Sequence, residues 1–269
     1  MVMTRLNKVS QSLRIALYFT AAILLALTVS PVYADNIVVP SGDTSTVGND
    51  NSGSLAGSIS SRQIEDDFAS SDFSSVSGPI SITSLAFRLE PSTGSMSATD
   101  TSFNMYLSTT PYSANSSEGG TMLTTNFATN LGADNTLVDS GGPGTLWSSS
   151  GCTGSGPCPF DVVFTFSTPF LYNPSNGNLL LDLQINGYNG SGTGEFDVQN
   201  YFGVPATAAV DEITGSGATG TQEFSDSVTE FTYAIPTPEP SSLFLLGSGL
   251  LGLLALAARS KRHARPLSC

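Results

Sequence analysis

The stretch Leu179-Leu180-Leu181-Asp182-Leu183-Gln184-Ile185 decides the fold class of this chain. Leucine or isoleucine occupies positions 179, 181, 183 and 185, whereas positions 182, 184 and 186 are polar. Such period-two alternation is typical of a β-strand with one face in a core and the other in water. Residues 160–167 repeat the pattern, with phenylalanine or valine at positions 160, 162, 164 and 166. The middle of the chain is therefore expected to be built from half-buried strands.

Further alternating segments extend this pattern in both directions along the chain. Two more strands are clear at 85–90 and 103–107, and weaker ones are expected at 37–39, 136–138, 195–198 and 227–233. Turn-rich stretches at 141–144, 173–177 and 186–190 separate several of them, and Asn-Gly pairs supply the positive φ that tight turns need. No amphipathic helix is evident away from the two termini. The expected fold is all-β: a β-sandwich of jelly-roll type, flanked by an N-terminal signal helix and a C-terminal transmembrane helix.

The N-terminal segment has the features of a secretory signal peptide. Arg5, Lys8 and Arg14 precede an apolar stretch at 15–29, and small residues at 32 and 34 flank Tyr33. This order predicts a signal peptide at 1–34 with cleavage between Ala34 and Asp35. The exported domain is then expected at 35–235. Its Ser/Gly-rich part at 43–61 is either a long first loop or a disordered lead-in.

The C-terminal segment has three consecutive parts. Residues 236–242 form a proline-rich spacer with the tripeptide Pro238-Glu239-Pro240, and 243–258 are an apolar run of 16 residues. A helix of that length spans roughly 24 Å, a marginal length for a bilayer core of about 30 Å. Residues 259–269 form a basic tail with cationic side chains at Arg259, Lys261, Arg262 and Arg265. The positive-inside rule places this tail in the cytoplasm and the domain outside.

These three parts together resemble the PEP-CTERM sorting signal of Gram-negative bacteria. The resemblance implies recognition of the tripeptide by exosortase, a membrane-embedded processing protease, and final localisation at the cell surface or in the extracellular matrix. Such proteins are typically made by bacteria that export polysaccharide. Segments 106–110, 130–138 and 168–174 also look like a recurring domain type among these proteins, which implies a sandwich domain and says nothing about its chemistry.

The expected exported domain is strongly acidic. It contains 21 of the 22 acidic residues but only two cations, Arg62 and Arg88, a formal charge of −19, and it lacks lysine and histidine. Such a surface disfavours nucleic acid and anionic lipid headgroups, because each phosphate contact needs a cation. Either the acids form a solvated exterior or they collect Ca²⁺. The densest acidic spots are Glu65-Asp66-Asp67 and Asp211-Glu212, and neither lies in an EF-hand loop. No cofactor is expected, with a structural Ca²⁺ as the alternative.

The residue inventory excludes most catalytic classes. The only histidine, His263, lies in the tail, so Ser-His-Asp and Cys-His catalysis lack their imidazole in the domain. Ser-Lys catalysis lacks its base, because 35–235 contain no lysine. The sequence Asp139-Ser140-Gly141 resembles an aspartic-protease motif, but no second copy exists, and a turn after a strand is favoured. A glycoside hydrolase needs a pair of carboxylates, for which the candidates are Asp161, Asp182, Glu195 and Asp197. Alternation favours the interpretation that these four form a polar outward face.

Two further features concern single side chains. Cys152 and Cys158 bracket a short loop in an oxidising compartment and are predicted to form a disulfide; Cys269 lies in the tail. Trp147, the only tryptophan, is a candidate ligand-binding residue or a partly buried cover residue.

The expected function is a structural or adhesive role, without catalysis, for a membrane-anchored surface or matrix protein. A carbohydrate-binding module is the alternative, and a carboxylate glycoside hydrolase is the third candidate. Expected partners are an exosortase-type protease, the membrane and extracellular polysaccharide.

Overall fold

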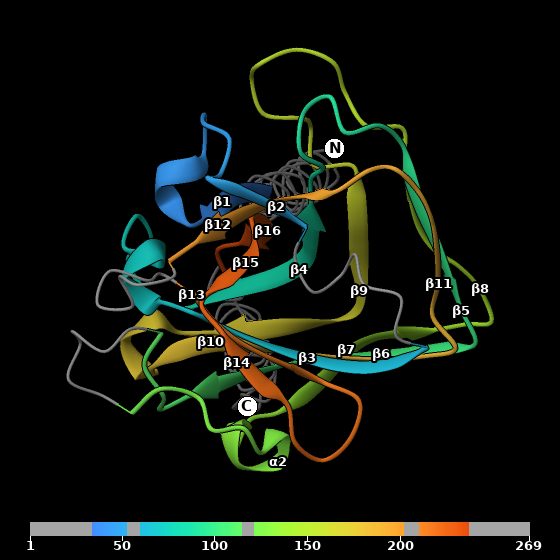
Figure 1. Ribbon diagram of the computed structural model, residues 1–269. Helices are drawn as coiled ribbons and strands as arrows, with labels where there is room; N and C mark the ends of the chain where they lie inside the picture. Colours follow the sequence, from blue (N-terminus) through green and yellow to red (C-terminus); the bar gives the residue numbers. More distant parts are fainter. Residues whose placement is uncertain (1–33, 53–59, 115–120, 202–209, 237–269) are drawn as a thin grey trace, which may run out of the picture. The chain divides into compact units, whose positions relative to one another are not determined.

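The computed structural model describes residues 34–52, 60–114, 121–201 and 210–236, and strands dominate these ranges (Figure 1). The predicted signal helix, the tripeptide Pro238-Glu239-Pro240, the apolar run at 243–258 and the basic tail lie outside the described residues. Within the described ranges, no helix has the length and apolar character needed to cross a membrane.

A four-stranded antiparallel sheet joins the two ends of the domain. Its order is β1 (Ala34–Val39), β16 (Thr229–Ala234), β4 (Ile80–Phe87) and β9 (Val162–Tyr172). Ala34 is in register with Ala234, so the predicted cleavage site adjoins the end of the last strand. β16 is an interior strand, because it pairs with β1 on one side and with β4 on the other.

A six-stranded antiparallel sheet forms the second large layer. Its order is β14 (Thr221–Glu223), β13 (Val210–Gly215), β3 (Ser61–Phe68), β10 (Asn178–Asn186), β6 (Ser102–Thr110) and β7 (Thr136–Gly141). Two three-stranded sheets complete the described strands. One contains β11 (Asn189–Gly192), β5 (Met96–Asp100) and β8 (Gly144–Ser149), and the other contains β15 (Ser225–Ser227), β12 (Phe196–Asn200) and β2 (Asp50–Ser52).

Helical structure in the described ranges is confined to short turns. The four-residue helix α2 (Phe127–Asn130) is capped by Asn126, whose side chain accepts a hydrogen bond from the Ala128 amide. The 3₁₀ turns are η1 (Ser41–Asp43), η3 (Ser70–Phe73) and η5 (Pro174–Asn176). The sequence prediction of an all-β domain is confirmed at this level.

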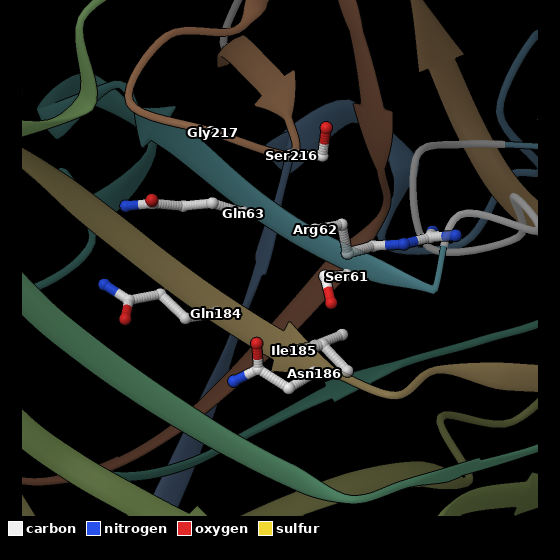
Figure 2. Close-up of a pocket in the computed structure, with 8 residues that line it drawn as sticks. All are labelled: Ser61, Arg62, Gln63, Gln184, Ile185, Asn186, Ser216 and Gly217. Carbon is white, nitrogen blue, oxygen red and sulfur yellow. The ribbon is translucent and has the colours of Figure 1, made fainter.

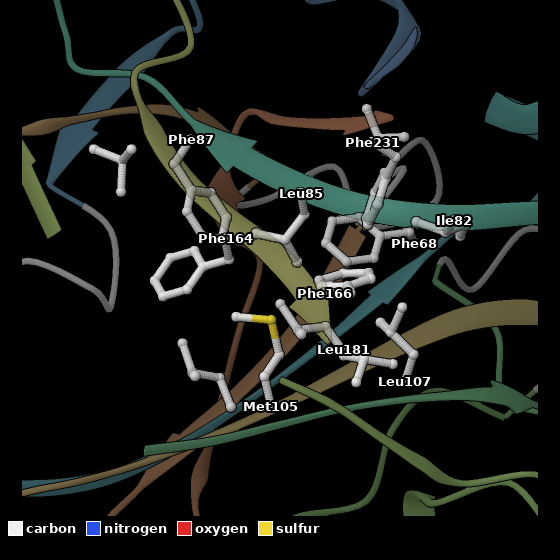
Figure 3. Packing of buried hydrophobic residues seen from close by; sticks show 14 of the residues in the cluster. Phe68, Ile82, Leu85, Phe87, Met105, Leu107, Phe164, Phe166, Leu181 and Phe231 are labelled. Atoms are coloured by element: carbon white, nitrogen blue, oxygen red, sulfur yellow. The ribbon is translucent and has the colours of Figure 1, made fainter. Parts of the chain in front are cut away.

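One hydrophobic core lies between the two large sheets (Figure 3). Ile82, Leu85 and Phe231 enter it from the four-stranded sheet, and Leu107 and Leu181 enter it from the six-stranded sheet. All five are fully or almost fully buried. Burial of this apolar surface is the main favourable term in folding, at roughly 25 cal/mol per Å².

The 179–185 stretch lies in β10, and side chains on both faces of this strand are buried. The alternation predicted burial of one face only. Its odd-numbered apolar residues enter the core as expected, but Leu180 and Asp182 on the opposite face are also buried. Leu180 packs against Leu123 and Phe127, which belong to the segment around α2. The outward face expected to be in water is therefore partly covered by this segment.

β9 differs from its predicted bounds. It starts at Val162 rather than Phe160 and continues through Pro169 to Tyr172. Proline is tolerated there because β9 is an edge strand and its pairing with β4 is irregular between Ile82 and Ser84. Asp139-Ser140-Gly141, where a turn was favoured, lies in β7.

The disulfide prediction is confirmed. Cys152 and Cys158 are bonded, with their Cα atoms 5.6 Å apart, and close a loop after β8. This bond restricts the unfolded chain and thereby contributes stability.

A candidate binding face and the buried charges beneath it

The four carboxylates that are candidates for a catalytic pair do not share one exposed surface. Asp182 and Asp197 have exposed fractions of 1% and 0%, which contradicts the prediction that all four lie on an outward polar face. Asp161 is exposed and accepts a hydrogen bond from the Ser149 hydroxyl, and Glu195 is half-buried beside β12. A glycosidase needs its two acids within reach of the same sugar bond.

Asp197 forms a buried ion pair with Arg88, one of the domain's two cations. The Arg88 Nε atom lies 2.6 Å from Asp197 Oδ2, and both side chains are at most 1% exposed. Arg88 Nη2 also donates to the main-chain oxygens of Asp43 and Thr46, and its guanidinium lies 4.8 Å from the centre of the Phe160 ring. This arrangement satisfies a buried charge with several polar partners, as burial requires.

The ion pair fixes the loop after β1 against β12. The Gly48 amide donates to Asp197 Oδ1 at 2.7 Å. A Cβ atom at Gly48 would collide with the Val198 carbonyl oxygen, so the close approach needs glycine. Residues 43–48, in the stretch expected to be a long loop or a disordered lead-in, thus have defined contacts here.

The outer face of the six-stranded sheet carries a row of three side-chain amides and one hydroxyl. Gln184 on β10 is in register with Gln63 on β3 and with Asn104 on β6, and Asn104 is in register with Ser140 on β7. We call Gln63, Gln184, Asn104 and Ser140 the amide row. Gln184 follows Leu183, which enters the core, so the row is on the face directed away from the core.

Asp182 holds two of these amides in place. Gln63 Nε2 donates to Asp182 Oδ1 and Gln184 Nε2 donates to Asp182 Oδ2, each at 2.8 Å. The two glutamines line a shallow pocket of about 150 Å³ together with residues Ser61, Arg62, Ile185, Asn186, Ser216 and Gly217. Figure 2 shows Gln63 and Gln184 extending to the same side of β3 and β10, whereas the Arg62 side chain extends to the other side.

Glu65 lies directly opposite Asp182 on the neighbouring strand and is fully buried. Asn130 Nδ2 donates to Glu65 Oε2 at 2.7 Å, whereas Glu65 Oε1 has no hydrogen-bond partner among the described residues. Burial raises the pKa of Glu65 to about 8, and the nearby Asp182 adds to the rise although the Asn130 hydrogen bond opposes it. Glu65 is therefore protonated at neutral pH.

This pKa predicts that the domain loses stability as the pH rises. In the unfolded chain Glu65 releases its proton near the ordinary value of 4.5, whereas in the folded domain it keeps the proton until about pH 8. The folded state binds more protons between these values, so the free energy of unfolding falls from pH 4.5 towards pH 8 and then levels off. Urea denaturation across this range measures the slope.

The matched variant is Glu65→Gln, which keeps the acceptor for Asn130 but does not titrate. We expect a shallower slope rather than a flat one, because burial also raises the pKa of Asp182. An unchanged slope in Glu65→Gln would show that Glu65 does not carry this dependence.

Trp147 is not available as a ligand platform. It has an exposed fraction of 4% and packs against the rings of Phe164, Tyr188 and Phe196. It lies in β8 rather than in a loop. Of the two interpretations of Trp147, its burial favours the cover residue, and the side chain belongs to the core.

The acidic run Glu65-Asp66-Asp67 lies within β3, where successive side chains point to opposite faces of the sheet. Of Asp211-Glu212 only the backbone, in β13, is described. Across the described ranges, no group of three or more acidic, histidine or cysteine side chains is arranged to hold a metal ion. The expected lack of a cofactor and the alternative of a structural Ca²⁺ both stay predictions.

Sequence reasoning missed the amide row because it missed β3. The acidic run at 65–67 hides the alternation of Ile64 and Phe68, which both enter the core. Two features of the sequence could have indicated this site: the even spacing of Ile64 and Phe68, which is compatible with a strand, and the position of Gln184 on a strand that was predicted.

Comparison with known families identifies the C-terminal segment. Residues 236–262 match the PEP-CTERM protein-sorting motif, which confirms the resemblance seen in the sequence. The match implies export, surface or membrane association, and processing by exosortase. None of the curated proteins shows significant similarity to the chain.

Proposed function

We propose that this chain, which carries a PEP-CTERM sorting signal at 236–262, is a tethered structural protein of the bacterial surface or extracellular matrix without catalytic activity. The jelly-roll-like sandwich expected from the strand pattern is the architecture that we propose for its exported part. Signal-peptide cleavage after Ala34 and membrane insertion of 243–258 belong to the same proposal.

The pairing of β16 is the observation that supports a structural role most directly. The sorting signal follows β16, so any pull on the tether is applied to the end of this strand. β16 is held by backbone hydrogen bonds to β1 and β4 along both of its edges. A strand paired on both sides has no free edge and resists being drawn out of its sheet.

The placement of the acids supports a non-catalytic role. Asp182 and Asp197 are engaged by amides and by Arg88, and they lie on different strands of different sheets. Asp161 and Glu195 are the candidates that solvent can reach.

A comparison of the variant Asp161→Asn/Glu195→Gln with wild type tests the non-catalytic role in cells. We expect cells with this variant to keep the same cohesion of their extracellular matrix as wild-type cells. We expect the matrix to lose cohesion when residues 35–235 are exchanged for an unrelated domain between the same two signals. Loss of cohesion in the carboxylate variant together with unchanged cohesion after the domain exchange would contradict the proposal.

The sorting signal gives a separate prediction. Alanine at Pro238, Glu239 and Pro240 should abolish processing, because exosortase recognition of the motif is expected to need this tripeptide. Cell fractionation and immunoblotting should then show an unprocessed protein in the membrane fraction. Alanine at the adjacent Ser241 and Ser242 is the control and should leave processing intact. Equal processing of the tripeptide variant and wild type would remove this part of the proposal.

A further inference from the structure

The amide row has the features of a prepared hydrogen-bonding surface. Gln63 and Gln184 each use one N–H bond to hold Asp182. An amide has two N–H donors and one acceptor oxygen, so each side chain keeps one donor and one acceptor for a further partner. Because Asp182 fixes both side chains, binding of a ligand would not carry the full entropy cost of ordering them.

The charges around this surface are hidden from a ligand. Asp182 and Glu65 lie below it with exposed fractions of 1% and 0%, and Glu65 is neutral at pH 7. The Arg62 guanidinium turns to the opposite face and lies 4.3 Å from the centre of the Tyr188 ring (Figure 2). The pocket therefore offers amides and hydroxyls in a protein that is otherwise strongly acidic. Hydroxyl groups suit these partners, whereas an anion or a cation would gain no direct ion pair here.

Apolar side chains continue the surface on one side of the row. Tyr106 on β6 is the neighbour of Asp182 in register, and Leu137 on β7 is the neighbour of Tyr106. Tyr106 is half-buried and Leu137 is 42% exposed. A sugar ring has hydroxyl groups at its edge and C–H groups on its face. Amides beside a tyrosine and a leucine match both parts of that ring.

We propose that the amide row and the adjoining Tyr106 bind a neutral, hydroxyl-rich glycan along the outer face of the six-stranded sheet. This inference rests on the proposed function only for its location outside the cell. The simpler interpretation is that the two glutamines serve only to solvate Asp182. The two interpretations differ in what they predict for Asn104, which extends the row, whereas the hydrogen bonds to Asp182 come from the two glutamines. If the glutamines only solvate Asp182, Asn104 takes no part in binding a ligand.

The test is binding of the purified full chain to an array of neutral linear oligosaccharides built from glucose, mannose, galactose or N-acetylglucosamine. Oligomers of uronic acids serve as the charged comparison. We expect binding to at least one neutral series and none to the uronic acids. Binding to no neutral series, or preferential binding to uronic acids, overturns the inference. Because the assay uses purified protein, its outcome is independent of the structural role in cells.

Variants then locate the site on the bound oligosaccharide by calorimetric titration. Gln63→Met and Gln184→Met keep the side-chain length but remove the amide, and each should weaken binding about tenfold or more through lost hydrogen bonds. Gln199→Met, at a half-buried glutamine on β12, is the matched control and should bind as wild type.

The glutamine variants also disturb Asp182, so Asn104→Ala separates binding from folding. We expect about threefold weaker binding by Asn104→Ala with an unchanged melting temperature. Wild-type affinity in both Asn104→Ala and Gln63→Met would exclude the amide row as the site.

Discussion

The variant Arg88→Met should unfold at a much lower urea concentration than wild type, with a loss of about 3–5 kcal/mol in the free energy of unfolding. The substitution leaves the buried Asp197 carboxylate without its 2.6 Å partner and frees the carbonyl oxygens of Asp43 and Thr46. A buried charge without a partner costs far more than the net value of the pair. Fluorescence of Trp147, the chain's single tryptophan and a buried one, reports the transition.

A second substitution separates the unpaired charge from the lost packing. Arg88→Met/Asp197→Asn removes both charges of the buried pair, and the introduced amide oxygen can still accept the hydrogen bond from the Gly48 amide. We expect the double variant to recover a large part of the stability, so that the two changes are strongly non-additive. If the double variant were less stable than Arg88→Met alone, the interpretation based on charge would be wrong.

The variant Trp147→Ala should lose about 3–5 kcal/mol of stability, the usual cost of truncating a large buried aromatic side chain. It removes the ring that contacts Phe164, Tyr188 and Phe196 and leaves a cavity among them. Thermal unfolding followed by circular dichroism measures the effect, because this variant lacks the fluorescent reporter.

Two controls accompany this prediction. Leu171→Ala removes a large apolar side chain that is 63% exposed at the sheet edge, and it should change stability by at most about 0.5 kcal/mol. Trp147→Phe should cost much less than Trp147→Ala, because it keeps an aromatic ring and removes an indole N–H that has no partner among the described residues. Similar stability of Trp147→Ala and Leu171→Ala would contradict the buried role.

Local pattern predicted the strands whose polar and apolar residues alternate cleanly. The core side of β10, the central part of β6 and the disulfide between Cys152 and Cys158 agree with those predictions. β3 was missed because its acidic run interrupts the alternation, although Ile64 and Phe68 enter the core. The sorting signal needed no structure, because its order of tripeptide, apolar run and basic cluster is continuous in sequence and matches a known motif.

Which polar side chains are buried was decided only by tertiary structure. Asp182 and Asp197 occupy positions that alternation assigns to the outward face, yet both are buried. Asp182 lies beneath Gln63, which is 119 residues away and donates to it from the neighbouring strand, and Gln184 donates to its other oxygen. Asp197 meets Arg88 from 109 residues away.

The sequence by itself thus determined the export and sorting of this protein, its all-β class and the core face of its best strands. These properties depend on local order and on a two-residue period, which each segment carries alone. The burial of its carboxylates, the amide row above Asp182 and the place of Trp147 required the folded chain. Each depends on contacts between segments that are distant in sequence. The free energy of burying a charge depends on the polar partners that these contacts place beside it.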